Sequence, residues 1–301
     1  MGTAENSITV RRPPTPSPTG DTRCRWSSAS ADFGAVADAL SLLMPHLEPL
    51  AIATVREATT GLDPHSQVPG TAADWIRQEA AHQRAHRRYN DALLENSPAL
   101  ARVDRLIGHI TGFLKRRRLR LRLAFTVGFE AVAYSVARWV EPRMATLFVG
   151  AEPATASMFL WHLAEEVEHK SVVHDVHVAS GGSRAGRLGG GLLALAVVGP
   201  LTILGTLTLL AGRGRMLRPG TWGRLVSWSV SFAFSSLTAV GMLAATGHGP
   251  ADLADPLWYK QYLRGSDPDT GSPMLWSPPG SGCSEPAQGR ESSVSNGPLT
   301  S

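Results

Sequence analysis

Two Glu-x-x-His motifs in helical segments constrain the fold of this 301-residue chain more than any other feature. Glu79 and His82 form the first motif, and Glu166 and His169 form the second. A spacing of three residues puts both members of a motif on the same face of an α-helix. Each of two helices therefore presents a carboxylate beside an imidazole, which indicates a metal site in the core of a helical bundle.

The surrounding chain has the periodicity of helices. Between about residues 32 and 180, apolar residues recur at helical spacing, and the alternation that indicates strands is missing. We predict four helices, over residues 45–60, 71–95, 98–140 and 153–179. Pro45 and Pro49 suit the first turn of the first of these helices. The expected fold class is all-α, with a four-helix bundle and a C-terminal hydrophobic helical hairpin.

The other two predicted helices each carry one glutamate with a suitable position. Glu48 lies in the first helix, and Glu130 lies in the apolar stretch LAFTVGFEAVAYSVA of the third. A lone carboxylate in a core helix is costly unless it is paired or bound to a metal. One Glu from each of two helices and one Glu-x-x-His from each of the others form a dimetal carboxylate site. The predicted metal ligands are Glu48, Glu79, His82, Glu130, Glu166 and His169, and the four glutamates are also the predicted catalytic residues.

The ligand types indicate the metal. Four carboxylates balance the charge of two divalent cations, and two neutral imidazoles complete the coordination. Oxygen-rich ligation favours iron or manganese over zinc, and the only two cysteines, Cys24 and Cys283, lie near the chain ends. We therefore expect two iron ions, with manganese as the substitute, and O2 as co-substrate.

Two more histidines share the ligand faces. His86 lies four residues after His82, and His162 lies four residues before Glu166. Each is an extra metal ligand, a partner that orients a ligand, or a surface histidine. The sequence leaves these three roles open.

Other polar residues of these segments carry weaker expectations. We expect Glu165, Glu168 and Asp175 on a solvated or ion-paired face. His174 and His177 either pair with Asp175 or lie at a membrane surface, and the sequence does not separate the two.

Three stretches resemble a known family. They are MPHLEPLAIATVREA (44–58), IRQEAAHQRAHRRYN (76–90) and WHLAEEVEHKSVVHDV (161–176), and the resemblance covers about residues 40–265. The family is the bacterial predicted metal-dependent hydrolases, a branch of the ferritin-like superfamily. The resemblance implies a ferritin-like dimetal fold with the six ligands given above.

Composition divides the chain into four parts. Residues 1–31 and 265–301 are rich in Ser, Pro and Gly, which predicts disordered tails. Residues 32–182 form the predicted bundle, and residues 183–264 form the predicted apolar hairpin. Residues 188–212 and 225–247 carry no charged side chain, and each run is long enough to cross roughly 30 Å of hydrocarbon.

The hairpin has three interpretations. It spans a membrane, dips into one leaflet, or packs on the bundle and hides an apolar substrate channel. Arg213, Arg215, Arg218 and Arg224 lie between its arms without an acidic residue. We expect association with the cytoplasmic side of the cell membrane, and otherwise a cytoplasmic protein. The basic run 115–122 is either a solvated surface or a contact for anionic headgroups, and it lacks the aromatic residues typical of nucleic-acid binding.

The leading functional hypothesis is a di-iron oxidase or oxygenase. It would use O2 and an external electron donor to oxidise a small or lipid-like substrate, with N-oxidation in secondary metabolism as one example. The alternative is a two-metal hydrolase that attacks an ester or amide. A third hypothesis is a non-catalytic iron-binding membrane protein. We expect no nucleic-acid partner, and a homodimer fits the sequence.

Overall fold

The computed structural model describes residues 8, 11, 26–27, 30–243 and 249–264. These residues form α-helices joined by short connections, together with one isolated bridge between Ser27 and Ala151. The predicted all-α class is confirmed for this part of the chain. The helices are α1 (Ala31–Thr59), α2 (Gln67–Asn96), α3 (Leu100–Lys115), α4 (Leu119–Val140), α5 (Met144–Leu147), α6 (Pro153–His169), α7 (Val172–Ala179), α8 (Arg184–Gly212), α9 (Pro219–Met242) and α10 (Leu257–Arg264), with 3-10 turns at Glu141–Arg143 and Pro250–Asp252.

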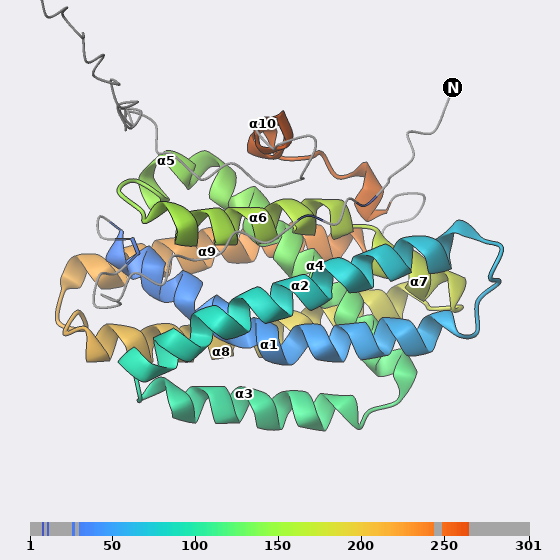
Figure 1. The fold of residues 1–301 in the computed structure, drawn as a ribbon, viewed down its shortest axis with the longest axis horizontal. Coiled ribbons are helices and arrows are strands. Elements are labelled where there is room, and N and C mark those ends of the chain that lie inside the picture. Colours follow the sequence, from blue (N-terminus) through green and yellow to red (C-terminus); the bar gives the residue numbers. More distant parts are fainter. Residues whose placement is uncertain (1–7, 9–10, 12–25, 28–29, 244–248, 265–301) are drawn as a thin grey trace, which may run out of the picture.

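The bundle surrounds α4. Helix α4 packs against α1, α6, α7, α8 and α9, and α1 packs along α2 (Figure 1). Helix α3 connects α2 to α4 and lies against α1 and α8. Figure 1 shows α1 and α2 running lengthwise side by side, with α6 above them. The four segments predicted to carry ligands therefore lie in α1, α2, α4 and α6.

The predicted start of the first helix is wrong. Helix α1 contains Pro45 and Pro49 in its interior, where each proline leaves the carbonyl four residues earlier without its helical donor. Side chains of α2 replace the missing donors. Asn90 Nδ2 donates to the carbonyl oxygen of Ser41 at 2.8 Å, and Arg87 Nη2 donates to that of Pro45 at 3.3 Å. Helix α1 can therefore continue through both prolines, and the same bonds hold it against α2.

Two other predicted helices are each divided in the structure. The segment 98–140 becomes α3 and α4, and the break falls at Arg116–Arg118 within the basic run. Like charges on neighbouring turns destabilise a helix, so the cationic run is a suitable place for the break. The segment 153–179 becomes α6 and α7, with a break at Lys170 and Ser171. Both ligand motifs still lie within unbroken helices.

Glycines allow α8 to approach α4 closely. A Cβ atom on Gly190 would lie 2.0 Å from the carbonyl oxygen of Ala124, and one on Gly128 would lie 2.5 Å from that of Gly190. The backbones themselves are thus in contact at this crossing, which no larger residue permits. This contact fixes α8 against the helix that carries Glu130.

Within the described part of the chain, three helices, α1, α8 and α9, are long and apolar enough to cross a membrane. The apolar window of α1 is 78% buried inside the bundle, whereas those of α8 and α9 are only 33% and 17% buried. Helices α8 and α9 expose large apolar side chains. These include Leu192, Ile203, Trp222, Val226, Val230, Phe234 and Leu237.

The basic turn of the hairpin is tied to the start of α1. Arg215 Nε donates to Asp32 Oδ1 at 2.6 Å, and Arg224 Nε donates to Asp32 Oδ2 at 2.8 Å. Arg213 Nη2 donates to Asp38 Oδ2 at 2.7 Å. The acids that pair with this turn come from α1, far away in sequence. The hairpin therefore lies along the bundle, which fits the interpretation in which it packs on the bundle.

The predicted tails fall mostly outside the described residues. Three described residues before residue 30 are nevertheless buried against the bundle. Trp26 packs on Phe33 and Phe159, and its Nε1 donates to Asp38 Oδ1 at 2.9 Å. Ser27 and Arg11 are the other two.

We expect Asp32→Asn to lower the free energy of unfolding by about 1–3 kcal/mol, because it removes the partner of two arginines. Burial raises the pKa of Asp32, but hydrogen bonds from Arg215 and Arg224 lower it by a larger amount. The net pKa of Asp32 therefore lies below its ordinary value. The difference in unfolding free energy between Asp32→Asn and the wild type should therefore be fully present above the pKa of Asp32 in the unfolded chain, about 4. It should disappear as pH falls through the lower pKa of Asp32 in the folded protein. Urea unfolding at several pH values measures this. Asp175→Asn, at an exposed position, should change stability by less than about 0.5 kcal/mol.

Candidate metal centre

The bundle core brings all six predicted ligands into one buried cluster. None of the six is more than 3% exposed. Two overlapping groups of ligand atoms lie within 4.8 Å of one another, and each could hold a metal ion. The first group is Glu79, His82, Glu166 and His169, and the second is Glu48, His82 and His162.

Helices α2 and α6 supply the centre of the first group. Glu79 Oε1 lies 3.3 Å from His82 Nδ1 on its own helix and 3.0 Å from His169 Nδ1 on α6. Glu166 Oε2 and Glu130 Oε2 each lie 3.8 Å from His169 Nδ1. The three-residue spacing therefore places the side chains as predicted, because both side chains of each motif point toward the facing helix.

Helix α1 contributes Glu48 to the second group. Glu48 Oε1 lies 3.8 Å from His162 Nε2, and His162 Nε2 lies 2.8 Å from Glu166 Oε1. His82 belongs to both groups. Two adjoining sets of ligands with one residue in common are a suitable frame for a pair of metal ions.

Unsatisfied polar atoms show that the cluster fits cations. Buried polar atoms normally have hydrogen-bond partners. Each of the six residues nevertheless has at least one buried oxygen or nitrogen without a hydrogen-bond partner among the described residues. These atoms are Glu48 Oε1 and Oε2, Glu79 Oε1 and Oε2, His82 Nδ1, Glu130 Oε1, Glu166 Oε2 and His169 Nδ1. Bound metal ions would satisfy this set of oxygens and imidazole nitrogens.

Two residues that the sequence analysis missed as partners orient the imidazoles. His82 Nε2 lies 3.0 Å from Glu165 Oε2, and His169 Nε2 lies 2.7 Å from Gln78 Oε1. With Nε2 engaged, each ring presents Nδ1 to the cluster. Such outer hydrogen bonds fix the orientation and basicity of a ligating histidine. The helical register offered a signal, because Gln78 and Glu165 directly precede Glu79 and Glu166.

The three acids expected on a solvated or ion-paired face are all ion-paired. Glu165 is fully buried and pairs with Arg11 Nη1 at 3.5 Å. Glu168 pairs with Arg11 Nη2 at 2.6 Å and accepts from Tyr259. Asp175 is exposed and pairs with His174 at 3.0 Å. His177 is buried, and burial followed by the nearby Arg187 charge lowers its pKa to about 4.

His86 and His162 form a chain that leads away from the cluster. His162 Nδ1 lies 2.6 Å from His86 Nε2, and His86 Nδ1 lies 2.7 Å from Ser41 Oγ. Ser41 Oγ donates to Asn90 Oδ1 at 2.7 Å. His162 thus lies next to Glu166 and Glu48, whereas the two ring nitrogens of His86 bond to His162 and Ser41. The geometry favours His162 over His86 as an extra ligand.

Burial and neighbouring charges shift the pKa values of the four buried carboxyl groups. Burial, followed by repulsion from Glu79, raises the pKa of Glu48 above its ordinary range and that of Glu166 to about 7. Burial, then Glu166, likewise raises the pKa of Glu130. Burial also acts on Glu79, but His169 and His82 lower its pKa below the ordinary range. Divalent cations would relieve this repulsion, because metal ions replace protons on such ligands.

We expect Glu165→Gln to weaken metal binding about 10- to 100-fold, because the charged partner that orients His82 is lost. Isothermal titration of the metal-free protein with Mn(II) measures the change. Glu57→Gln, at an exposed acid that pairs with Arg122, is the matched control and should bind as the wild type does. Equal affinities for the two variants would contradict the orienting role.

The family comparison decides between the functional hypotheses. Residues 10–252 match the model of a family described as predicted metal-dependent hydrolases. Neither a curated protein nor a solved structure matches the chain significantly. The family description names hydrolysis, so the expected di-iron oxidase or oxygenase is wrong, and so is its assignment as an oxidoreductase. A Glu and His ligand set serves both chemistries, which is why the residues did not separate them. The match covers most of the chain, and the protein belongs to the family of predicted metal-dependent hydrolases.

Proposed function

We propose that this protein is a two-metal hydrolase with its reaction centre in the core of the bundle. The observation that carries the proposal is the set of buried oxygens and imidazole nitrogens without hydrogen-bond partners, in a chain of a metal-dependent hydrolase family. The proposed ligands are Glu48, Glu79, His82, Glu130, Glu166 and His169, with His162 as a further ligand. When bound, the metal ions would supply a Lewis acid and a water of lowered pKa.

The chain's own residues prepare the site. Gln78 and Glu165 hold two imidazoles with Nδ1 toward the cluster, so little reorganisation is needed when a cation binds. The nearly complete burial of the ligands excludes bulk water from the reaction centre and strengthens electrostatic interactions there. The order of ligands along the four helices supports a ferritin-like bundle as the finer architecture.

The ligand chemistry supports iron or manganese as the metal. Four carboxylates and two imidazoles are hard and borderline donors, and no thiolate takes part. The same set carries a charge that two divalent ions balance.

We also propose that the outer face of α8 and α9 associates with the cytoplasmic side of a membrane. Val226, Val230 and Phe234 on this face are 60%, 52% and 72% exposed. Contiguous exposed apolar surfaces of this kind mark sites of interaction. Arg184 and Arg218, exposed near opposite ends of the hairpin, would suit anionic headgroups.

Metal content tests the main proposal. Protein purified without chelator should carry two metal ions per chain by mass spectrometry, and Glu130→Ala and Glu166→Ala should lose at least one of them. Glu95→Ala, at an exposed position of α2, should retain both. Hydrolysis of an ester and amide panel should then persist under strict anaerobiosis without a reductant. Activity that requires O2, or a metal-free wild type, would overturn the proposal.

Membrane sedimentation tests the association. Wild-type protein should sediment with membranes, and Val230→Asp with Phe234→Asp should move it to the soluble fraction, because burying a charge in the interface is costly. Val149→Asp, whose side chain is 47% exposed and belongs to neither α8 nor α9, should leave sedimentation unchanged. A wild-type chain recovered in the soluble fraction would contradict the association.

A further inference from the structure

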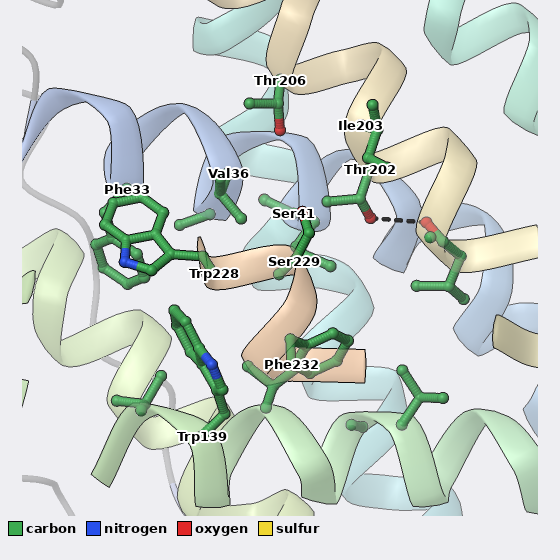
Figure 2. A pocket seen from close by; sticks show the side chains of 18 of the residues that line it. Phe33, Val36, Ser41, Trp139, Thr202, Ile203, Thr206, Trp228, Ser229 and Phe232 are labelled. Carbon is green, nitrogen blue, oxygen red and sulfur yellow. Dashed lines mark hydrogen bonds between the residues drawn. The ribbon is translucent and has the colours of Figure 1, made fainter. Parts of the chain in front are cut away.

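An apolar cavity lies between the bundle and the hairpin. Its volume is about 640 Å³, which falls within the range of about 300–1,000 Å³ typical of small-molecule sites. Residues of α1, α4 and α6 from the bundle and of α8 and α9 from the hairpin line it, and Figure 2 labels several of those from α1, α4, α8 and α9. The cavity is therefore built by the packing of the hairpin against the bundle.

One part of the cavity wall belongs to the metal centre. His162 and Glu166 line the cavity, and so does His86, which bonds to His162. Ser41 of the same hydrogen-bonded chain also lines it. The proposed reaction centre is thus in direct contact with this space.

The rest of the wall is mostly apolar. Figure 2 shows aromatic rings from three helices around the space, Phe33 from α1, Trp139 from α4 and Trp228 with Phe232 from α9. Among the residues that line the cavity, only Glu166 is an acid, and none is a lysine or arginine. The Thr202 hydroxyl donates to the carbonyl oxygen of Val198 in its own helix at 2.8 Å, so its donor is already used. The wall offers mainly hydrocarbon contact, and Thr206 Oγ1 is a buried polar atom in it without a hydrogen-bond partner among the described residues.

The cavity opens between residues of the hairpin. Ile203, Val226 and Val230 line it and are 51%, 60% and 52% exposed. These residues belong to the apolar outer face of α8 and α9. An apolar molecule can therefore reach the cavity without crossing a polar surface.

We propose that the cavity binds the hydrocarbon chain of an ester or amide whose scissile carbonyl lies beside Glu166 and His162. This assignment rests on the proposed hydrolase function and names its substrate class, acyl compounds with a long alkyl chain. Hydrolysis joins the hydroxyl of water to the carbonyl carbon and breaks the bond to the leaving oxygen or nitrogen. The leaving alcohol or amine takes the proton, so the reaction needs no oxidant or reductant.

Calorimetry with straight-chain fatty acids, the products of such a reaction, tests the assignment on the manganese-loaded protein. From hexanoate to dodecanoate, affinity should rise roughly fourfold for each added methylene, because each one leaves water for the apolar wall. Affinity that does not change with chain length would overturn the proposal.

Two glycines of α8 give a matched pair of variants. Gly199 lines the cavity and Gly189 does not, and a Cβ atom on either would meet no atom within 4 Å. Gly199→Phe should weaken dodecanoate binding by at least about tenfold, because the ring occupies the space of several methylenes. Gly189→Phe should bind as the wild type does. Equal binding by the two variants would place the fatty acid on the outer face and overturn the proposal.

A second measurement tests the proposal even if Gly199→Phe does not fold. Dodecanoate with bromine at its terminal carbon should quench tryptophan fluorescence in the wild type, and Trp228→Phe should reduce that quenching. Unchanged quenching would exclude the chain from the cavity. Chain-length-dependent binding without hydrolysis would overturn the hydrolase proposal alone, whereas hydrolysis of short esters without a gain in affinity would overturn the cavity assignment alone.

Discussion

The burial of four glutamates at one level of a helical bundle is the constraint on which the rest of this structure depends. Each carboxylate that leaves water loses solvation free energy, and repulsion between neighbours adds to the cost. Two imidazoles offset only part of it, as the raised pKa values of Glu48, Glu130 and Glu166 indicate. A bundle of this kind is most favourable with cations in its core, so metal binding and stability are linked.

Helix periodicity made the buried cluster of glutamates and histidines predictable. Spacings of three within α2 and α6 place Glu and His on one face, and the apolar sequence around Glu130 marks it as buried. The orienting partners Gln78 and Glu165 were not assigned, because their role depends on contacts with histidines of another helix, 91 and 83 residues away respectively. Periodicity describes one helix at a time, and it does not say which faces of two helices meet.

The start of α1 was mispredicted for the same physical reason. Local rules place Pro45 and Pro49 at a helix start, since an interior proline leaves a carbonyl without its donor. Asn90 and Arg87 of α2 provide those donors, so tertiary contacts override the local preference. The sequence did not distinguish oxidation from hydrolysis, because the same set of carboxylates and imidazoles can bind metal ions for either reaction.

Hydrogen bonds at the two ends of α9 restrict how a ligand can enter the molecule. At its start, Thr221 and Arg224 bond to Asp32, and just after its end Leu243 O accepts from Arg187 at 2.7 Å. A helix anchored in this way does not swing outward as a lid would. Passage into the interior then depends on rotamer changes of side chains between the anchors, which occur within nanoseconds. Entry should accordingly be fast and selective for narrow, flexible molecules.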